Sequence, residues 1–330
     1  MLFLIDQINN TEPSLNLALE EYLLRHLDIS RDYFLLYLNK PCVIIGRHQN
    51  VFEEVNYPLL RKRGIPVFRR ISGGGAVYHD PGNVNFSFIT RYQKFKFNNY
   101  RLFNAPILQA LQSLGVPAEL NGRNDIVVNQ LKISGNAQFT THDRMVSHGT
   151  LLFSSELDNI GMLLHTSTSG FKSRAIKSVR STVVNISELL DQSLDLAKFK
   201  ELIIKHVFSN VTDIPQYRLT ASDWKNVHSL ASQKYQSWEW NFGESPDFTF
   251  QNILKTPAGK ITLELEVKKC RLAQIELSGN LPYHIQANIT RMLLGVRYHP
   301  ENILAALQDL NLNSGQKHFI EKIFFDNQEK

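Results

Sequence analysis

Three consecutive glycines, Gly73–Gly75, form the segment with the clearest capacity for chemistry. Glycine has no Cβ atom, so it adopts positive φ angles and allows a ligand to lie against the backbone. Exposed N–H groups in such a turn line an anion-binding concavity. Arg69 and Arg70 precede the glycines and His79 follows them, so the segment suits a phosphate or a carboxylate. Taken alone, three glycines are explained equally well by a plain surface loop between two strands.

The residues around the glycines exclude two familiar phosphate-binding motifs. No helical pattern follows them, as the dinucleotide fingerprint requires, and no Gly-Lys-Ser/Thr stands at the distance of a P-loop. The segment therefore belongs to neither class.

A lysine beside a turn of small residues is the second candidate. Lys132 is followed by Ile133-Ser134-Gly135-Asn136. On a strand before such a turn, its ammonium group would be directed at a fixed point and would supply a point charge suited to a phosphate. An exposed strand lysine is the commoner interpretation of this residue alone. Asp125 offers the hard oxygen ligands that Mg²⁺ prefers, although an Asx-type turn or a helix cap is at least as common an explanation.

Three segments further along have simple structural explanations beside their functional ones. His148-Gly149-Thr150 precedes an apolar run, and a lone histidine there is more often structural than catalytic. Residues 177–185 are typical of a solvated basic turn followed by a strand. Residues 237–243 contain two tryptophans and a phenylalanine, and such aromatic clusters usually belong to the core.

Helices and strands that position these candidates are visible in the apolar pattern. Residues 14–27 repeat apolar side chains at helical spacing after the start signals Pro13 and Ser14. Pro66–Arg70 is a predicted strand leading into the glycines, and the alternating residues 84–88 predict a half-buried strand. The other predicted elements are strands Tyr33–Leu38 and Cys42–Ile45, paired across Asn39-Lys40-Pro41, a helix over Leu102–Leu114, a hairpin of Ile126–Val128 and Leu131–Ile133 around Asn129-Gln130, and a strand over Gly149–Phe153.

A change of pattern near residue 243 predicts a domain boundary. Residues 242–256 have weak periodicity and contain Gly243, Ser245 and Pro246. We therefore predict a large domain over residues 1–243, a linker over 244–256 and a small α+β domain over 257–330. The small domain is predicted to contain strands over Ile261–Val267 and Leu272–Leu277 and a helix that includes Ile303 and Leu310.

Composition limits the class of protein. The chain has 330 residues, of which 43% are apolar, and a formal charge of +5, which favours anionic partners such as nucleotides and acidic proteins. No block of basic residues with interleaved aromatics indicates nucleic acid, and no apolar stretch approaches the roughly 18 residues of a membrane helix. Two distant cysteines and the absence of a signal-peptide pattern predict a cytoplasmic protein.

The order and spacing of the candidate segments are more specific than any one of them. Arg-Arg-x-Ser-Gly-Gly-Gly-Ala-Val-Tyr-His-Asp-x-Gly-Asn is followed by Gly-Arg-Asn-Asp, Lys-x-Ser-Gly-Asn-Ala, His-Gly-Thr-Leu-Leu, Ser-Val-Arg-Ser and Trp-Glu-Trp-Asn-Phe-Gly. Through about Gly243 the chain thereby resembles the bacterial lipoate–protein ligase A family. The C-terminal part is consistent with the accessory domain of that family but carries no sharp motif.

This resemblance implies a fold and a reaction. The fold class is α/β (α+β), the catalytic fold shared with biotin–protein ligases: a mixed, largely antiparallel sheet flanked by helices, with a small accessory domain. The implied reaction uses ATP and Mg²⁺ to convert lipoate to lipoyl-AMP with release of pyrophosphate. The lipoyl group then passes to a lysine on the lipoyl domains of 2-oxoacid dehydrogenase E2 subunits or on the glycine-cleavage H protein.

The resemblance also implies residue roles. Lys132 would be the catalytic residue, between the carboxyl group of lipoate and the α-phosphate, where catalysis rests on positioning and electrostatics. The implied contacts to ATP and lipoyl-AMP come from Arg70, Gly75, Ala76, Val77, Tyr78, Asn83, Asp125 and Lys132. The implied contacts to lipoate come from Ser72, Gly73, Gly74, His79, Lys132, His148 and Thr150. Asp125 is also the candidate ligand for magnesium.

Three alternatives remain at this stage. An octanoyl or lipoyl transferase of the same superfamily uses no ATP and forms a thioester on a cysteine, but residues 121–185 contain none and Cys42 and Cys270 lie elsewhere. A biotin ligase is disfavoured because its Gly-Arg-Gly-Arg type of loop is absent. A non-catalytic lipoate-binding module is disfavoured because Lys132 and the glycines are present.

Overall fold

The computed structural model describes residues 1–6, 10–122, 124–164, 170–179, 181–209, 211–256, 259–310 and 314–325. Two residues of the sequence motifs, Arg123 and Arg180, lie outside this set. The chain forms two compact units. The first consists of Met1–Arg47, Ile65–Gly161 and Ser178–Ser237, and the second of His48–Gly64, Met162–Lys177 and Trp238–Lys330.

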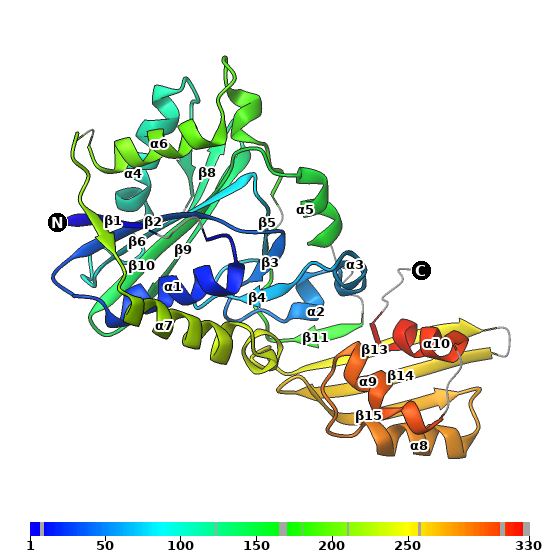
Figure 1. The fold of residues 1–330 in the computed structure, drawn as a ribbon. Helices are drawn as coiled ribbons and strands as arrows, with labels where there is room; N and C mark the ends of the chain where they lie inside the picture. Colours follow the sequence, from blue (N-terminus) through cyan, green and yellow to red (C-terminus); the bar gives the residue numbers. More distant parts are fainter. Residues whose placement is uncertain are drawn as a thin grey trace. The chain divides into compact units, whose positions relative to one another are not determined.

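An eight-stranded sheet forms the framework of the first unit (Figure 1). Its order is β12-β1-β2-β6-β10-β9-β8-β7. Strand β1 pairs in parallel with β12 and β2, and the other neighbours are antiparallel, which confirms the predicted mixed, largely antiparallel sheet. The bounds are β1 (Leu2–Asp6), β2 (Asp32–Leu38), β6 (Asn83–Arg91), β7 (Glu119–Asn121), β8 (Asp125–Val128), β9 (Leu131–Thr140), β10 (Arg144–Leu152) and β12 (Gln216–Arg218).

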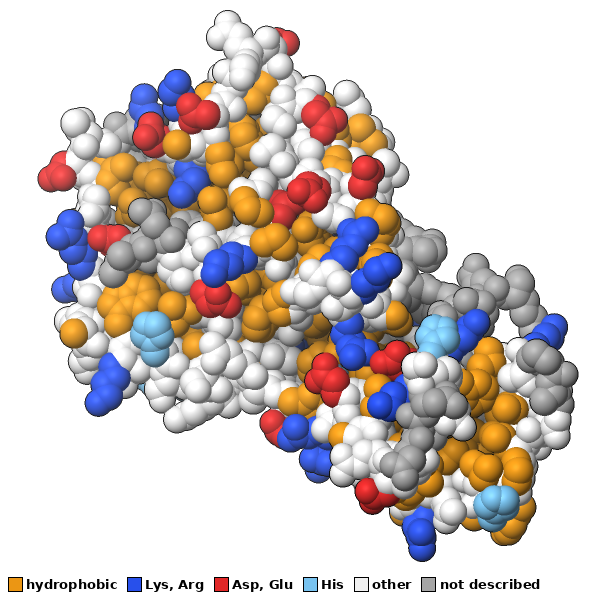
Figure 2. Space-filling view, turned by 45° about the vertical axis from the view of Figure 1, so that its right-hand side comes forward, with side chains coloured by type: hydrophobic (Ala, Val, Ile, Leu, Met, Phe, Trp, Pro, Cys, Tyr) orange, Lys and Arg blue, Asp and Glu red, His pale blue; other side chains and the backbone are white. Residues whose placement is uncertain are grey.

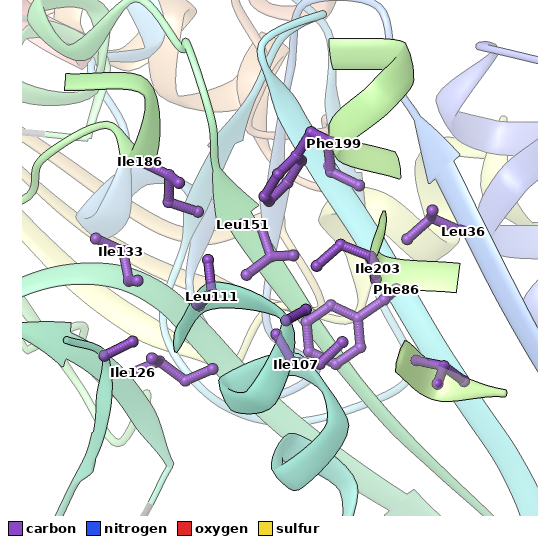
Figure 3. Close-up of a cluster of buried hydrophobic side chains, with 14 of the residues drawn as sticks. Leu36, Phe86, Ile107, Leu111, Ile126, Ile133, Leu151, Ile186, Phe199 and Ile203 are labelled. Atoms are coloured by element: carbon purple, nitrogen blue, oxygen red, sulfur yellow. The ribbon is translucent and has the colours of Figure 1, made fainter. Parts of the chain in front are cut away.

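Helices cover both faces of this sheet. Helices α4 (Tyr100–Ser113) and α6 (Leu196–Val207) lie over one face, and α1 (Pro13–His26) and α7 (Ala221–Leu230) over the other (Figure 1). Between the sheet and α4 and α6, Phe86, Leu151 and Ile203 pack together in a hydrophobic core (Figure 3). Burying each such side chain contributes about 1.5–3 kcal/mol.

Strand β6 differs from the half-buried strand that its alternation predicts. Its apolar residues Phe86 and Phe88 face the core, as expected, but Asn85 and Ser87 are also buried. The reason is that α1 covers the second face of the sheet, where Glu20 accepts a hydrogen bond from Ser87. The alternation of apolar and polar residues therefore predicted the strand correctly, but it did not reveal that the polar face of the strand is buried as well.

The predicted pairing of residues 33–38 with residues 42–45 is wrong. Strand β2 pairs with β1 and β6, whereas β3 (Cys42–Ile45) pairs with β4 (Val67–Arg69) and β5 (Val77–His79) in a separate three-stranded sheet. A tight hairpin needs positive φ in its turn, but Pro41 holds Lys40 in extended backbone, so the chain continues from one sheet into the other. The segment between β4 and β5, residues 70–76, is called the glycine loop below.

The predicted hairpin of β8 and β9 is confirmed. Its turn residues Asn129 and Gln130 have φ angles of 49° and 68°, as a type I′ turn requires. The register of β8 against β9 shifts by one residue beside Ile133, because Ile126 is opposite Ser134 whereas Val127 is opposite Lys132. A bulge of this kind redirects the side chains around it.

The second unit contains a four-stranded sheet of order β11-β13-β14-β15. The sequence predicts a linker over residues 244–256, whereas Phe248–Thr256 form β13, which pairs along its whole length with β14. The other bounds are β11 (Phe171–Ser173), β14 (Gly259–Lys268), β15 (Arg271–Gly279), α2 (Val51–Glu54), α3 (Tyr57–Arg63), α8 (Tyr283–Leu293), α9 (Pro300–Ala306) and α10 (Ser314–Phe325).

Shorter elements complete the described chain: α5 (Leu157–Leu163), the 3₁₀ turns η1 (Ile186–Leu189) and η4 (Gln308–Leu310), and the π-helical turns η2 (Ala231–Tyr235) and η3 (Glu239–Gly243). In the part of the chain that the structure describes, the helices are too short or too polar to cross a membrane.

Candidate active site

The buried guanidinium of Arg70 supports the glycine loop from inside. Its Nη2 donates to the carbonyl oxygens of Gly73 at 2.6 Å and Gly75 at 2.9 Å, and its Nε donates to Ser72 Oγ at 3.0 Å. Burial lowers the pKa of Arg70 to about 10, against the opposing charge of Glu20. The loop is therefore shaped by a cation within it, and this distinguishes it from a plain surface loop.

The glycines allow backbone to approach backbone. A Cβ atom on Gly46, which follows β3, would lie 2.1 Å from the carbonyl oxygen of Gly74. Gly74 itself has a φ of +94°, and a Cβ atom on Gly75 would lie 2.9 Å from Ser178 Oγ. Ser178 in turn accepts a hydrogen bond from the N–H of Ala76 at 2.9 Å. Residues 177–185 were expected as a solvated turn, but Ser178 holds the end of the glycine loop.

Replacing Gly46 with alanine is expected to destabilise the protein by about 1–3 kcal/mol, because the new methyl group overlaps the backbone of Gly74. Gly161→Ala is the matched control, since a Cβ atom at helical Gly161 meets nothing within 4 Å and alanine favours a helix. Thermal unfolding of both variants measures the difference. Equal unfolding temperatures would contradict a close contact between Gly46 and the glycine loop.

A polar chain runs from the glycine loop to helix α1. Ser72 Oγ lies 2.7 Å from His148 Nε2, and His148 Nδ1 lies 2.9 Å from both carboxylate oxygens of Glu20. Ser87 donates a further hydrogen bond to Glu20. Burial acts to raise the pKa of Glu20, but the charge of His148, the two hydrogen bonds and the charge of Arg70 together hold that pKa below its usual range. Glu20 is thus a buried anion that balances Arg70.

Glu20 is a residue that the sequence analysis missed. It lies on α1 between Leu19 and Glu21, and its side chain is buried. Asn16, one turn earlier, is buried as well. Polar residues spaced by four among the apolar residues of this helix were the available signal, since buried polar groups require partners inside the protein.

Lys132 lies near the start of β9 and forms an ion pair there. Lys132 Nζ is 2.9 Å from Asp125 Oδ1, and both side chains are about a quarter exposed, at 26%. A Cβ atom on Gly135 would lie 3.1 Å from Lys132 Nζ. Residues three apart on a regular strand point to opposite faces, so the bulge beside Ile133 is what turns Lys132 toward Gly135. The N–H of Gly135 also donates to Thr150 Oγ1 at 3.3 Å.

Backbone hydrogen bonds to the segment after Ser178 hold Lys132 in place in the fold. Its N–H donates to the carbonyl oxygen of Thr182 at 2.8 Å, and its carbonyl oxygen accepts from the N–H of Val184 at 3.1 Å. The glycine loop is close to the same strand, because a Cβ atom on Gly74 would lie 4.0 Å from that of Ala137. Strand β9, the glycine loop and the segment after Ser178 therefore border one site.

Like Arg70, Ser72 and Tyr78, the predicted site residues His79 and Asn83 lie inside the fold. His79 is buried, its Nδ1 accepts from Asn39 Nδ2 at 2.9 Å, and its Nε2 has no partner among the described residues. Burial, reinforced by the charges of Arg70 and His148, lowers the pKa of His79 to about 3, so the ring is neutral. Asn83 is also buried and donates to Asn85 at 3.0 Å. Roles for His79 and Asn83 in ligand binding stay predictions.

Lys132 and the glycine loop together form a site that is suited to holding two anions close to each other. Lys132 supplies a partly exposed positive charge, and the glycine loop presents backbone with little side-chain cover at Gly73–Gly75. Fixed cations and backbone dipoles stabilise charge that develops on reacting oxygens without having to reorganise. Val77 and Tyr78 lie in β5, directly after the loop, so they extend the same border.

Two family models match the chain. One, described as the lipoyl protein ligase A/B catalytic domain, covers residues 12–208, and the other, described as the bacterial lipoate protein ligase C-terminus, covers residues 245–326. A lipoate-protein ligase of Bacillus subtilis is 44% identical over 326 residues, which span 98% of this chain and 97% of the relative. Lipoate–protein ligase 1 of Staphylococcus aureus is 44% identical over 309 residues, which span 93% and 94%.

Two solved structures resemble the fold. A structure of lipoate-protein ligase A bound with ATP is 25% identical, with a TM-score of 0.64, and the match spans 74% of this chain and 100% of that one. A putative lipoate protein ligase from T. acidophilum with bound lipoic acid is 25% identical, with a TM-score of 0.62, over 73% of this chain and 98% of that one.

Proposed function

Since this chain belongs to the lipoate–protein ligase A/B family, we propose that it activates lipoate with ATP and transfers the lipoyl group to a lysine of an acceptor lipoyl domain. The acceptors would be 2-oxoacid dehydrogenase E2 subunits or the glycine-cleavage H protein, in the cytoplasm. The observation that carries this proposal is the position of Lys132, whose ammonium is directed over Gly135 by a bulge in β9, on the strand that borders the glycine loop.

The first step joins two anions. A carboxylate oxygen of lipoate attacks the α-phosphorus of ATP, a mixed anhydride bond forms, and the bond to pyrophosphate breaks. Lys132 would lie between the carboxylate and the α-phosphate and reduce their repulsion, while Arg70 keeps the glycine loop in place for the nucleotide. Holding both reactants in one geometry and stabilising the charge that develops on their oxygens both lower the barrier.

Magnesium is the proposed companion of ATP. Among the residues that the structure describes, no three His, Cys, Asp or Glu side chains gather around a common point. Mg²⁺ in nucleotide sites instead uses one or two carboxylates together with phosphates and water. The part-exposed carboxylate of Asp125 fits that use, and the ion would neutralise phosphate oxygens.

The ATP-independent transferase is disfavoured by the state of both cysteines. Cys42 and Cys270 are both buried, and burial raises the pKa of the Cys42 thiol well above its usual range. The nucleophile of such a transferase is a thiolate, so Cys42 is held in the unreactive form. In the Cys42→Ser variant, the rate of lipoyl transfer from lipoate and ATP is therefore expected to stay within about twofold of the wild-type rate, with the difference caused by altered packing. Mass spectrometry of an acceptor domain measures the transfer.

Pyrophosphate exchange into ATP tests the proposal as a whole. Exchange that depends on lipoate is expected, and transfer to an acceptor should stop when ATP is omitted. Equal transfer from an acyl-carrier donor without ATP, combined with loss of transfer in Cys42→Ser, would support the transferase instead. A protein that binds lipoate but catalyses no exchange would be a non-catalytic module.

A further inference from the structure

A cavity of about 450 Å³ lies within the second unit, between helices α3 and α10. Its volume falls in the range of about 300–1,000 Å³ that is typical of small-molecule sites. Residues 318, 321, 322 and 325 line it from α10 at the spacing of one helical face, and residues 57, 58, 61 and 62 do so from α3. None of these residues belongs to the site described above.

Positive charge dominates the walls of this cavity, which we call the α3–α10 cavity. The basic residues that line it are Arg61, Lys62, His318 and Lys322, and the acidic one is Glu321. Arg61 already pairs with Glu321 at 3.2 Å and with Glu301 at 3.8 Å. Within the described parts of the chain, the side chains of Lys62, His318 and Lys322 have no such partner.

The helix dipole explains part of this charge but not all of it. Lys62 and Lys322 lie in the last turns of α3 and α10, where cations are favourable. The helix dipole does not determine whether the side chains of Lys62 and Lys322 point toward the cavity or away from it. His318 and Lys322 are four residues apart on α10 and so lie on one face of that helix. Lys62 and Lys322 line the same cavity, and two positive charges brought to one cavity are a cost in the absence of an anion.

Asn56 and four residues with apolar surface form the rest of the wall. Pro58 and Pro300 contribute rigid surface, and Tyr57 and Phe325 contribute aromatic rings. The Tyr57 hydroxyl is already bonded to His299 Nε2 at 2.5 Å, so it is not required by a ligand. A multiply charged group near the lysines, attached to a small apolar or ring-containing body, matches this combination.

We propose that the α3–α10 cavity binds a small phosphate-bearing metabolite with at least two negative charges. On the face shown in Figure 2, acidic and basic side chains are interspersed, so recognition would depend on the local cluster. The size of the cavity favours a small molecule over an acidic protein segment. This proposal does not rest on the ligase activity.

Calorimetric titration of the full chain with pyrophosphate tests the proposal. Wild-type protein is expected to bind at two classes of site, one of them the active site. The double variant Lys62→Gln/Lys322→Gln should lose the other class or bind there about tenfold more weakly, since two charge contacts are removed. Lys317→Gln is the matched control, because Lys317 is an exposed neighbour on α10 that does not line the cavity.

The results of these titrations distinguish a small anionic metabolite from an acidic protein segment. Pyrophosphate binding that is identical in wild type and the double variant would overturn the proposal. Saturable binding of a hexaglutamate peptide, lost in the double variant while pyrophosphate does not bind, would replace the metabolite with an acidic protein partner. Lipoate-dependent pyrophosphate exchange in the double variant reports separately on the ligase function, which should be unchanged.

Discussion

Lys132→Ala is expected to abolish lipoyl-AMP formation while leaving the fold intact. Removing one fixed charge from the reacting centre costs about a hundred- to a thousandfold in rate, and here the lost ammonium would separate two anions. Stability should change little, because Lys132 and Asp125 form a part-exposed pair, and such pairs contribute about 1 kcal/mol or less. Lipoate-dependent pyrophosphate exchange measures the loss.

Lys198→Ala is the matched control for this experiment. Lys198 Nζ pairs with Asp195 Oδ2 at 3.5 Å on the exposed surface of α6, so the variant removes a lysine–aspartate pair from the same unit without touching the site. Near-normal exchange by the Lys132→Ala enzyme would remove Lys132 from the catalytic role. Loss of exchange in Lys198→Ala to the same extent would point to a general effect of charge.

Local patterns predicted those parts of the site that depend on neighbouring residues. The glycine loop between two strands follows from Gly73–Gly75 and the apolar residues before them. The hairpin that carries Lys132 follows from two apolar runs separated by Asn129-Gln130, although the turn lacks the usual glycine. In each case the determining residues are adjacent in the sequence, so their spacing is informative.

The sequence could not predict features that depend on pairing between distant segments. Glu20 contacts His148 across 128 positions, and Ser178 contacts Ala76 across 102. The bulge that turns Lys132 exists only through the register of β9 against β8. The error with β2 and β3 has the same origin, since two adjacent apolar runs do not reveal that each will find a partner in a different sheet.

Arg70→Met is expected to cause the second large loss. Methionine keeps a similar length but leaves the carbonyl oxygens of Gly73 and Gly75 and the hydroxyl of Ser72 without their donor. It also leaves Glu20 as a buried carboxylate with one fewer compensating charge. Removing one partner of a buried charge pair destabilises a protein by about 3–5 kcal/mol, and a glycine loop displaced by about 1 Å reduces turnover by about a hundredfold.

Arg70→Lys separates these two effects. A lysine ammonium would compensate the charge of Glu20, but it cannot reproduce the planar fork that Arg70 directs at two carbonyl oxygens and a hydroxyl. The unfolding temperature of Arg70→Lys should therefore recover most of the way to wild type, while lipoate-dependent pyrophosphate exchange stays low. If exchange recovers together with stability, the role of Arg70 is to balance charge in the interior, and the shape of the glycine loop does not depend on its hydrogen bonds.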